Sequence, residues 1–230
     1  MMQEEVELLK IGFANRLYNM GLRIREFFSF IGTSWYIKLS LDFLLSYLFS
    51  SPYSIVMKEG PQTGISRDNL IYGETPLITM RDILKEAGVT KRDIFYDLGS
   101  GRGITVFLAN LYFGIPAAGI EAVPTMADKS YKIKEKMGLK EAQFYQGDFL
   151  QADISLGTIF YIAGTTFDDE TINKLKKKLS ALKKGVKIIT LSFPVESPYF
   201  KLIKKKKFKF SWGEAEVYFH ERTKTPVIEL

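Results

Sequence analysis

The sequence predicts an α/β fold: a mostly parallel, seven-stranded sheet with an antiparallel hairpin at its C-terminal end and a helical extension at its N-terminal end. Short apolar runs alternate with helical patterns between residues 94 and 192, as in parallel strands joined by crossover helices. A glycine-rich run at 99–103 directly follows the first of these strands, which is typical of Rossmann-like folds. The 230 residues suffice for one such core and an accessory segment.

The composition excludes several kinds of chemistry. The chain has no cysteine and one histidine, so we expect no disulfide, no thiol nucleophile and no metal site. Oxygen and backbone groups, or a bound cofactor, must then supply the chemistry. Residues 1–7 lack the basic region and cleavage site of a secretory signal, which predicts a cytoplasmic protein.

Residues 1–60 are predicted to form a helical segment that precedes a domain over residues 61–230. The apolar stretch 34–49 is short for a transmembrane helix. It also contains Lys38 and Asp42, which are spaced to pair with each other on one helix face. We expect a helix packed on the domain, with a helix lying on a membrane surface as the alternative.

The elements of the domain follow local patterns. Thr75 and Pro76 form an N-cap and first-turn pair, which predicts a helix that ends at Gly88. Apolar and alternating runs predict strands at 94–98, 117–121, 142–145, 158–163, 186–192, 208–212 and 216–221. The last two runs flank Gly213, as in a hairpin.

The C-terminal part of the chain is rich in lysine and contributes to the net charge of +6. The lysines are Lys174, Lys176, Lys177, Lys178, Lys183, Lys184, Lys187, Lys201 and Lys204 to Lys207. We expect a solvated face on a helix and an edge strand, with binding of a nucleic acid as the alternative. In the last strands we expect Trp212 and Phe219 in the core and His220 on the surface.

The glycine-rich run and its neighbours carry the first candidates for cofactor binding, which are Asp97, Gly99, Ser100, Gly101 and Gly103. Alternate glycines let the backbone approach a ligand at a helix N-terminus. Glu121 ends the next strand, roughly 20 residues on, where an acidic side chain can accept hydrogen bonds from both hydroxyls of a ribose. A nucleoside cofactor is therefore expected.

The glycine spacing distinguishes between two such cofactors. A dinucleotide-binding loop reads G-x-G-x-x-G, whereas this loop reads G-x-G-x-G and follows Asp97. A carboxylate there would repel a pyrophosphate, yet it can bind a cationic amino group. Asp148 and Phe149, after the third strand, can bind the amino group and the ring face of an adenine. Together these residues predict S-adenosylmethionine.

The motifs resemble those of the disruptor-of-telomeric-silencing-like, non-SET protein-lysine methyltransferases, a family of the class I methyltransferase superfamily. The resemblance runs from about residue 72 to residue 194 and rests on Tyr72-Gly73-Glu74-Thr75, Asp97 to Gly103, Gly119-Ile120-Glu121 and Gly147-Asp148-Phe149-Leu150. It implies S-adenosylmethionine as the methyl donor and a lysine of a protein substrate as the acceptor. In that family the loop with the first motif folds over the methionine end of the cofactor, so the resemblance places Tyr72, Glu74 and Thr75 at the site.

The family has an Asn-Asn-Phe-Ala-Phe run after the fourth strand, beside the transferred methyl group. Residues 162–167 read Ile-Ala-Gly-Thr-Thr-Phe here, so we expect an acceptor channel of another shape. An apolar, aromatic channel would favour neutral lysine, and its candidate walls are Tyr72, Tyr161, Thr165, Thr166 and Phe167. The candidate catalytic residues are Tyr72, Glu74, Thr165 and Phe167. An RNA or small-molecule methyltransferase, or a non-catalytic module that binds the cofactor, is the alternative.

Overall fold

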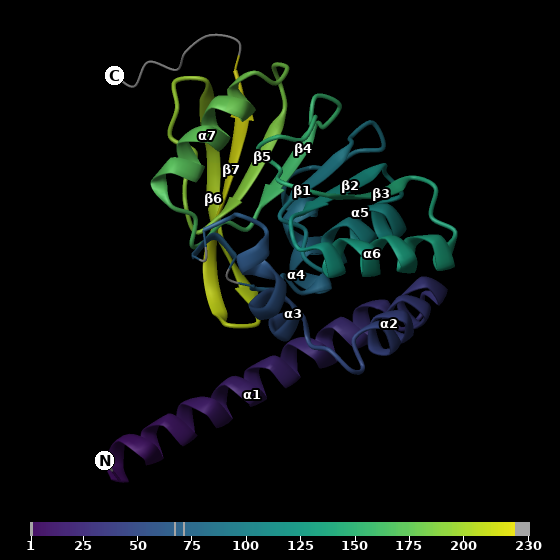
Figure 1. Ribbon diagram of the computed structural model, residues 1–230, viewed down its shortest axis with the longest axis vertical. Helices are drawn as coiled ribbons and strands as arrows, with labels where there is room; N and C mark the ends of the chain where they lie inside the picture. The colour runs from purple at the N-terminus through teal and green to yellow at the C-terminus, as the bar shows by residue number, and fades with distance from the viewer. Residues whose placement is uncertain (1, 67, 71, 224–230) are drawn as a thin grey trace.

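A computed structural model describes residues 2–66, 68–70 and 72–223, with side chains from residue 14 onward except that of residue 68. The strands form one sheet in the order β3-β2-β1-β4-β5-β7-β6 (Figure 1). They are β1 Phe95–Leu98, β2 Ala117–Glu121, β3 Ala142–Gln146, β4 Ile159–Ile162, β5 Lys187–Leu191, β6 Phe200–Phe210 and β7 Gly213–Arg222. The strands β1 to β5 pair in parallel, and β7 is antiparallel to β5 and β6. The predicted sheet is confirmed.

Helices cover both faces of this sheet (Figure 1). They are α1 Met2–Phe30, α2 Ser34–Ser46, α3 Pro52–Glu59, α4 Leu77–Glu86, α5 Ile104–Phe113, α6 Pro124–Met137 and α7 Asp169–Ser180, with short 3₁₀ turns η1 Gly60–Gln62 and η2 Asp68–Leu70. Successive residues of a strand face opposite sides, so Phe95 packs in the cluster that includes α4 and α5, whereas Tyr96 packs in the cluster that includes α7.

The N-terminal helices pack outside the helical layer of the domain. Helix α1 contacts α4, while α2 and α3 contact α6. Phe30 and Phe43 belong to the same buried cluster as the sheet. Asp42 pairs with Lys136 of α6 and not with Lys38, because Asp42 is turned toward the domain. Among the described residues, no helix has the length and apolar character needed to cross a membrane.

The start of α4 differs from the predicted one. The helix begins at Leu77, and Pro76 occupies the N-cap position that we expected for Thr75. The hydroxyl groups of Thr75 and Tyr161 instead form a buried hydrogen bond of 2.7 Å. A hydroxyl that is bonded elsewhere is not available to cap a helix.

The C-terminal hairpin is longer than predicted, because β6 begins at Phe200 and not near residue 208. Residues 204–207 are all lysines, so the first part of this strand shows no alternation of apolar and polar residues in the sequence. Lys204 and Lys206 each form an ion pair of 2.6 Å with Glu86 of α4. Strand β6 lies at the edge of the sheet, where lysines hinder pairing with another chain.

Two of the three expectations for the last strands are wrong. Trp212 is 44% exposed, because it lies in the turn of the hairpin and stacks on Phe210 from outside. His220 is only 3% exposed, because β7 lies inside the sheet. Its Nε2 accepts a hydrogen bond of 3.2 Å from the amide of Val195, and burial lowers its pKa to about 4. Phe219 is buried as predicted.

Candidate active site

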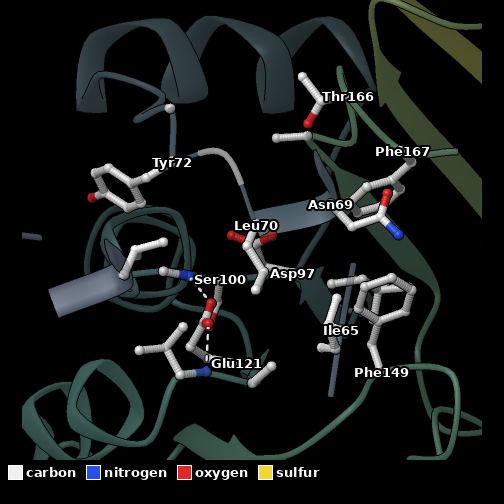
Figure 2. Close-up of a pocket in the computed structure, with 18 of the residues that line it drawn as sticks. Ile65, Asn69, Leu70, Tyr72, Asp97, Ser100, Glu121, Phe149, Thr166 and Phe167 are labelled. Carbon is white, nitrogen blue, oxygen red and sulfur yellow. Dashed lines mark hydrogen bonds between the residues drawn. The ribbon is translucent and has the colours of Figure 1, made fainter. Parts of the chain in front are cut away.

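A cavity of about 350 Å³, here called the first cavity, lies at the carboxyl ends of β1, β2 and β4 (Figure 2). It brings together most of the predicted site residues, which are Tyr72, Glu74, Thr75, Asp97, Gly99, Ser100, Gly101, Glu121, Asp148, Phe149 and Phe167. Gly103 and Thr165 do not line it. Residues from three strand ends therefore converge on one space, as the sequence predicted.

The loop between β1 and α5 needs its glycines for different reasons. Gly99, Gly101 and Gly103 have φ angles of 92°, 53° and 75°, which glycine adopts without strain. A β-carbon on Gly101 would lie 2.9 Å from the ring of Tyr72, and one on Gly103 would lie 2.3 Å from the ring of Phe144. The loop thus closes tightly against two aromatic rings, Tyr72 at Gly101 and Phe144 at Gly103.

Asp97 lies near the centre of the group of residues in Figure 2 and is only 3% exposed. Its Oδ2 accepts a hydrogen bond from the hydroxyl of Thr105, whereas Oδ1 has no partner among the described residues. Burial raises the pKa of Asp97 to about 8, so the carboxyl group is only partly ionised near neutral pH. A cationic ligand group would give Oδ1 its partner and favour the ionised form.

Glu121 ties the glycine loop to the end of β2. Its Oε2 accepts a hydrogen bond of 2.6 Å from the amide of Gly101, and its Oε1 accepts one of 2.9 Å from the amide of Val123 (Figure 2). Burial raises the pKa of Glu121, while these amides act in the opposite direction. Each oxygen keeps a second lone pair, so the predicted binding of ribose hydroxyls stays a prediction.

Asp148 and Phe149 bound the first cavity after β3. Asp148 Oδ1 accepts a hydrogen bond of 2.8 Å from the amide of Leu150, which fixes the turn. The rings of Phe149 and Phe167 stack, with centroids 5.6 Å apart. Phe167, a predicted catalytic residue, therefore lies beside the ring that we expected to contact adenine.

An arginine that the sequence analysis missed holds the loop with Tyr72 and Glu74. Arg102 donates from Nε and Nη2 to the two carboxyl oxygens of Glu74, at 2.6 and 2.7 Å, and its guanidinium lies over the rings of Phe43 and Tyr47. The hydroxyl of Tyr72 donates to Glu74 at 2.6 Å. Burial raises the pKa of Tyr72 well above its ordinary value, so this hydroxyl stays protonated. Glu74 thus positions Tyr72 and is itself held in an ion pair.

The segment between α3 and α4 lies along the first cavity, although the glycine and polar residues of 60–69 suggested a linker or a mobile loop. It contributes the lining residues Gly64, Ile65, Ser66, Asn69 and Leu70. Asn69 Nδ2 donates to Asp168 Oδ2 at 3.1 Å and to Thr171 Oγ1 at 2.9 Å, and the amide of Asp168 donates back to Asn69 Oδ1 at 2.9 Å. These bonds fasten the segment to the start of α7.

A second cavity, of about 820 Å³, adjoins the first. Both are lined by Tyr72, Gly73, Ala163 and Thr166, which form the boundary between them. The remaining lining residues are Asn15, Arg16, Asn19, Met20, Arg23, Tyr53, Thr165, Leu191, Ser211 and Trp212. The predicted catalytic residue Thr165 therefore lines the second cavity and not the first. Helix α1 forms one wall of this cavity, which the sequence analysis did not anticipate.

A solved structure of an RNA methyltransferase from Salinibacter ruber, in complex with S-adenosyl-L-homocysteine, matches this fold. The TM-score is 0.58 at 26% sequence identity, over 68% of this chain and 98% of that chain. The sheet order, the glycine loop and the buried carboxylates of Asp97 and Glu121 agree with such a cofactor. The fold and the first cavity define a class I S-adenosylmethionine-dependent methyltransferase, and the predicted cofactor is confirmed.

The family described as "Histone methylation protein DOT1" matches residues 65–216, and the chain belongs to this family. A protein-lysine N-methyltransferase of Saccharolobus islandicus is 31% identical over 127 residues, which are 54% of this chain and 77% of that protein. An H3 lysine-79 specific histone-lysine N-methyltransferase of Drosophila melanogaster is 28% identical over 134 residues, 52% of this chain. The chain spans only 7% of the length of the fly protein. The predicted family is confirmed.

Proposed function

We propose that the chain transfers the methyl group of S-adenosylmethionine to the side-chain amine of a lysine in a protein substrate. The observation that carries this proposal is the shared boundary of the two cavities at Tyr72, Gly73, Ala163 and Thr166. A donor in the first cavity and a side chain that enters from the second would meet there. The relatives named as protein-lysine and histone-lysine methyltransferases support lysine as the acceptor.

S-adenosylmethionine supplies a methyl group on an electrophilic sulfonium, so the protein has to bind, orient and exclude water. Asp97 Oδ1 would hold the cationic amino group, because it is buried and lacks a partner among the described residues. Glu121 and the amides of the glycine loop would face the nucleoside. Gly64, Ile65, Ser66, Asn69 and Leu70 border this cavity and would help to exclude water from the bound cofactor.

The boundary also suits an amine acceptor. Tyr72 donates its hydroxyl proton to Glu74 and interacts with Arg102, and the second lone pair of its oxygen could accept a hydrogen bond from an N–H of lysine. Such a bond would direct the lone pair of the nitrogen away from Tyr72. Partly apolar surroundings lower the pKa of lysine from about 10.4, so that the proton leaves through the open second cavity before transfer.

The proposal is tested by incubating the protein with methyl-labelled S-adenosylmethionine and a cell lysate, followed by mass spectrometry. We expect the label on lysine side chains. Label on a hydroxyl group or a nucleobase, with none on lysine, would overturn the proposal. Uptake of the cofactor without transfer to any fraction would favour the non-catalytic module.

Methylation of RNA stays an alternative, and the lysines of β6 argue against it. Lys204 and Lys206 are paired with Glu86, and Lys205 lies 3.4 Å from a carboxyl oxygen of Glu216. These carboxylates weaken the attraction of the strand for phosphates. Salt-dependent binding of RNA by the protein would restore this alternative. The cytoplasmic location stays a prediction.

We also infer that the N-terminal helices contact an anionic membrane surface. These helices and the connection between α2 and α3 expose large apolar side chains outside the second cavity, which are Leu17, Ile24, Phe27, Phe28, Ile37, Leu41, Leu44, Leu45, Leu48, Phe49 and Met57. All carboxylates within residues 14–59 bond to the domain, and these are Glu26, Asp42 and Glu59. The exposed charges of the same stretch, such as Arg25 and Lys58, are basic. Within residues 14–59, apolar and basic side chains without exposed acids suit an interfacial helix.

Cosedimentation of the full chain with vesicles tests this inference. We expect binding to phosphatidylcholine vesicles that contain phosphatidylserine, and weaker binding after Phe49→Asp, because the Phe49 side chain is 96% exposed. Leu156→Asp is the matched control, since Leu156 is an exposed apolar residue of the domain. Equal binding of wild type and Phe49→Asp, or concentration-dependent dimerisation through these helices, would contradict the inference.

A further inference from the structure

The second cavity carries positive charge on one wall. Helix α1 supplies Asn15, Arg16, Asn19, Met20 and Arg23 to the lining, a spacing that places these residues on one helix face. The described lining of this cavity contains two arginines and no carboxylate. Within the described residues, no ion pair involves Arg16 or Arg23, although Glu26 acts on Arg23 electrostatically. These guanidinium groups are therefore available to a ligand.

The distance between the two arginines suits an extended peptide. Seven residues of a helix span two turns, about 10.5 Å, so Arg16 and Arg23 lie about that far apart along α1. An extended chain covers the same distance in about three residues. A lysine that reaches the boundary residues Tyr72 and Thr166 would thus have its near neighbours beside the two arginines.

We propose that the second cavity binds a protein segment in which acidic side chains flank the acceptor lysine. Arg16 and Arg23 would bind the carboxylates, which guanidinium groups recognise in two-pronged hydrogen bonds. Asn15 and Asn19 lie on the same wall and can bond the peptide backbone. The proposal rests on the proposed function, because it names the substrate class of the same site.

The positive wall also acts on the acceptor itself. A lysine ammonium that approaches two guanidinium groups is repelled, and the repulsion lowers the pKa of the lysine. The neutral amine is the nucleophile, so the wall favours the reactive form. Acidic neighbours of the lysine in the substrate offset the electrostatic repulsion between the lysine and the two arginines of the wall.

Methylation kinetics with matched peptides test the proposal. One peptide carries glutamates one residue before and two residues after the lysine, three residues apart to match the two arginines, and the other carries glutamines there. For wild type we expect a KM about tenfold lower for the acidic peptide, in line with the strength of charge-assisted hydrogen bonds. In the double variant Arg16→Glu/Arg23→Glu we expect the preference to disappear or reverse.

Two controls keep the outcomes apart. Arg25→Glu changes an exposed arginine on the same helix that lines another cavity, beside Leu22 and Ile78, and is expected to keep the preference. The dissociation constant of S-adenosylhomocysteine should be the same in the double variant and in wild type. Equal KM values for both peptides in wild type, or a preference that survives the double variant, would overturn the proposal while lysine methylation stands.

Two further results would also overturn it. If no lysine is labelled in the lysate experiment, the proposed function fails first and this proposal fails with it. If an RNA oligonucleotide, and not the acidic peptide, competes for the second cavity and loses affinity in the double variant, the arginines bind phosphates.

Discussion

The two adjoining cavities are built in different ways. The floor of the first cavity consists of the ends of β1 and β2 and the groups that directly follow them, with Asp97 and Glu121 buried beside the glycine loop, while most of the rest of its lining comes from the segment before α4 and from the stretches after β3 and β4. The second is assembled from α1, the stretch after β4 and the turn of the C-terminal hairpin. The polar floor of the donor site thus depends on short local motifs, whereas the acceptor site depends almost wholly on how distant segments pack. Substitutions in one cavity should therefore leave the other largely unaffected.

The largest effect is expected from Gly103→Ala. A β-carbon there would lie 2.3 Å from the ring of Phe144, at a φ of 75° that suits glycine. We expect the free energy of unfolding to fall by about 2–4 kcal/mol, measured by denaturant titration. Gly138→Ala is the control, because Gly138 has a φ of 71° but no atom within 4 Å of the added carbon, and it should lose about 1 kcal/mol. Equal losses would show that the contact with Phe144 is unimportant.

Asp97→Asn should weaken cofactor binding with little change in shape. Asparagine can still accept the hydrogen bond from Thr105, but it offers no negative charge to the amino group of the ligand. A charge-assisted hydrogen bond contributes about 1.5–3 kcal/mol, so calorimetry should find the affinity for S-adenosylhomocysteine about 10–100-fold lower. An unchanged affinity would show that Asp97 does not bind the amino group of the ligand.

Asp97 should also make binding and stability depend on pH. Its pKa is about 8 in the folded protein and near 3.8 when unfolded, so the folded state binds more protons between these values. Asp97 should therefore contribute less stability as pH rises from about 4 to about 8; because the lowered pKa of His220 adds stability up to about pH 6.5, the net fall in the ligand-free protein is expected between about pH 6.5 and pH 8. A bound cation lowers the pKa of Asp97, so affinity should rise from about pH 4 to about pH 8. Thermal melting measures the pH dependence of stability, and calorimetry measures the pH dependence of cofactor affinity. Asp97→Asn should flatten both. Identical pH dependence in wild type and variant would contradict the assignment to Asp97.

The smallest effect is expected from Trp212→Ala, which alters the second cavity alone. Trp212 lines that cavity from the hairpin turn and is already 44% exposed, so its loss should cost little stability. We expect KM for a lysine peptide to rise about fivefold, near 1 kcal/mol, with no change in the affinity for S-adenosylhomocysteine. Weaker cofactor binding with an unchanged KM would show that Trp212 acts on the donor site and not on the acceptor site, which contradicts the assignment of the two cavities.

The same contrast explains what the sequence could predict. The mostly parallel sheet with its C-terminal hairpin, the residues Asp97 to Gly101 and Glu121 were predictable, because strand, turn and helix signals lie next to one another in the chain. The roles of Arg102 and Asn69 were not, since each depends on a partner far away in sequence, Glu74 in one case and Asp168 in the other.

The second cavity was the least predictable part. No motif marks Arg16 or Arg23, and only the packing of α1 brings them to the boundary residues. Trp212 was expected in the core as the last residue of the predicted strand 208–212. Its place in a hairpin turn follows only from the true bounds of β6, Phe200–Phe210, which the run of lysines within this strand made hard to recognise in the sequence.

A crystal structure of the protein with S-adenosylhomocysteine tests most directly the claim that donor and acceptor meet at one boundary. We expect the amino group of the ligand at Asp97 Oδ1 and its sulfur facing the second cavity between Tyr72 and Thr166. A sulfur that points away from the second cavity, or a ligand bound outside the first one, would contradict this account.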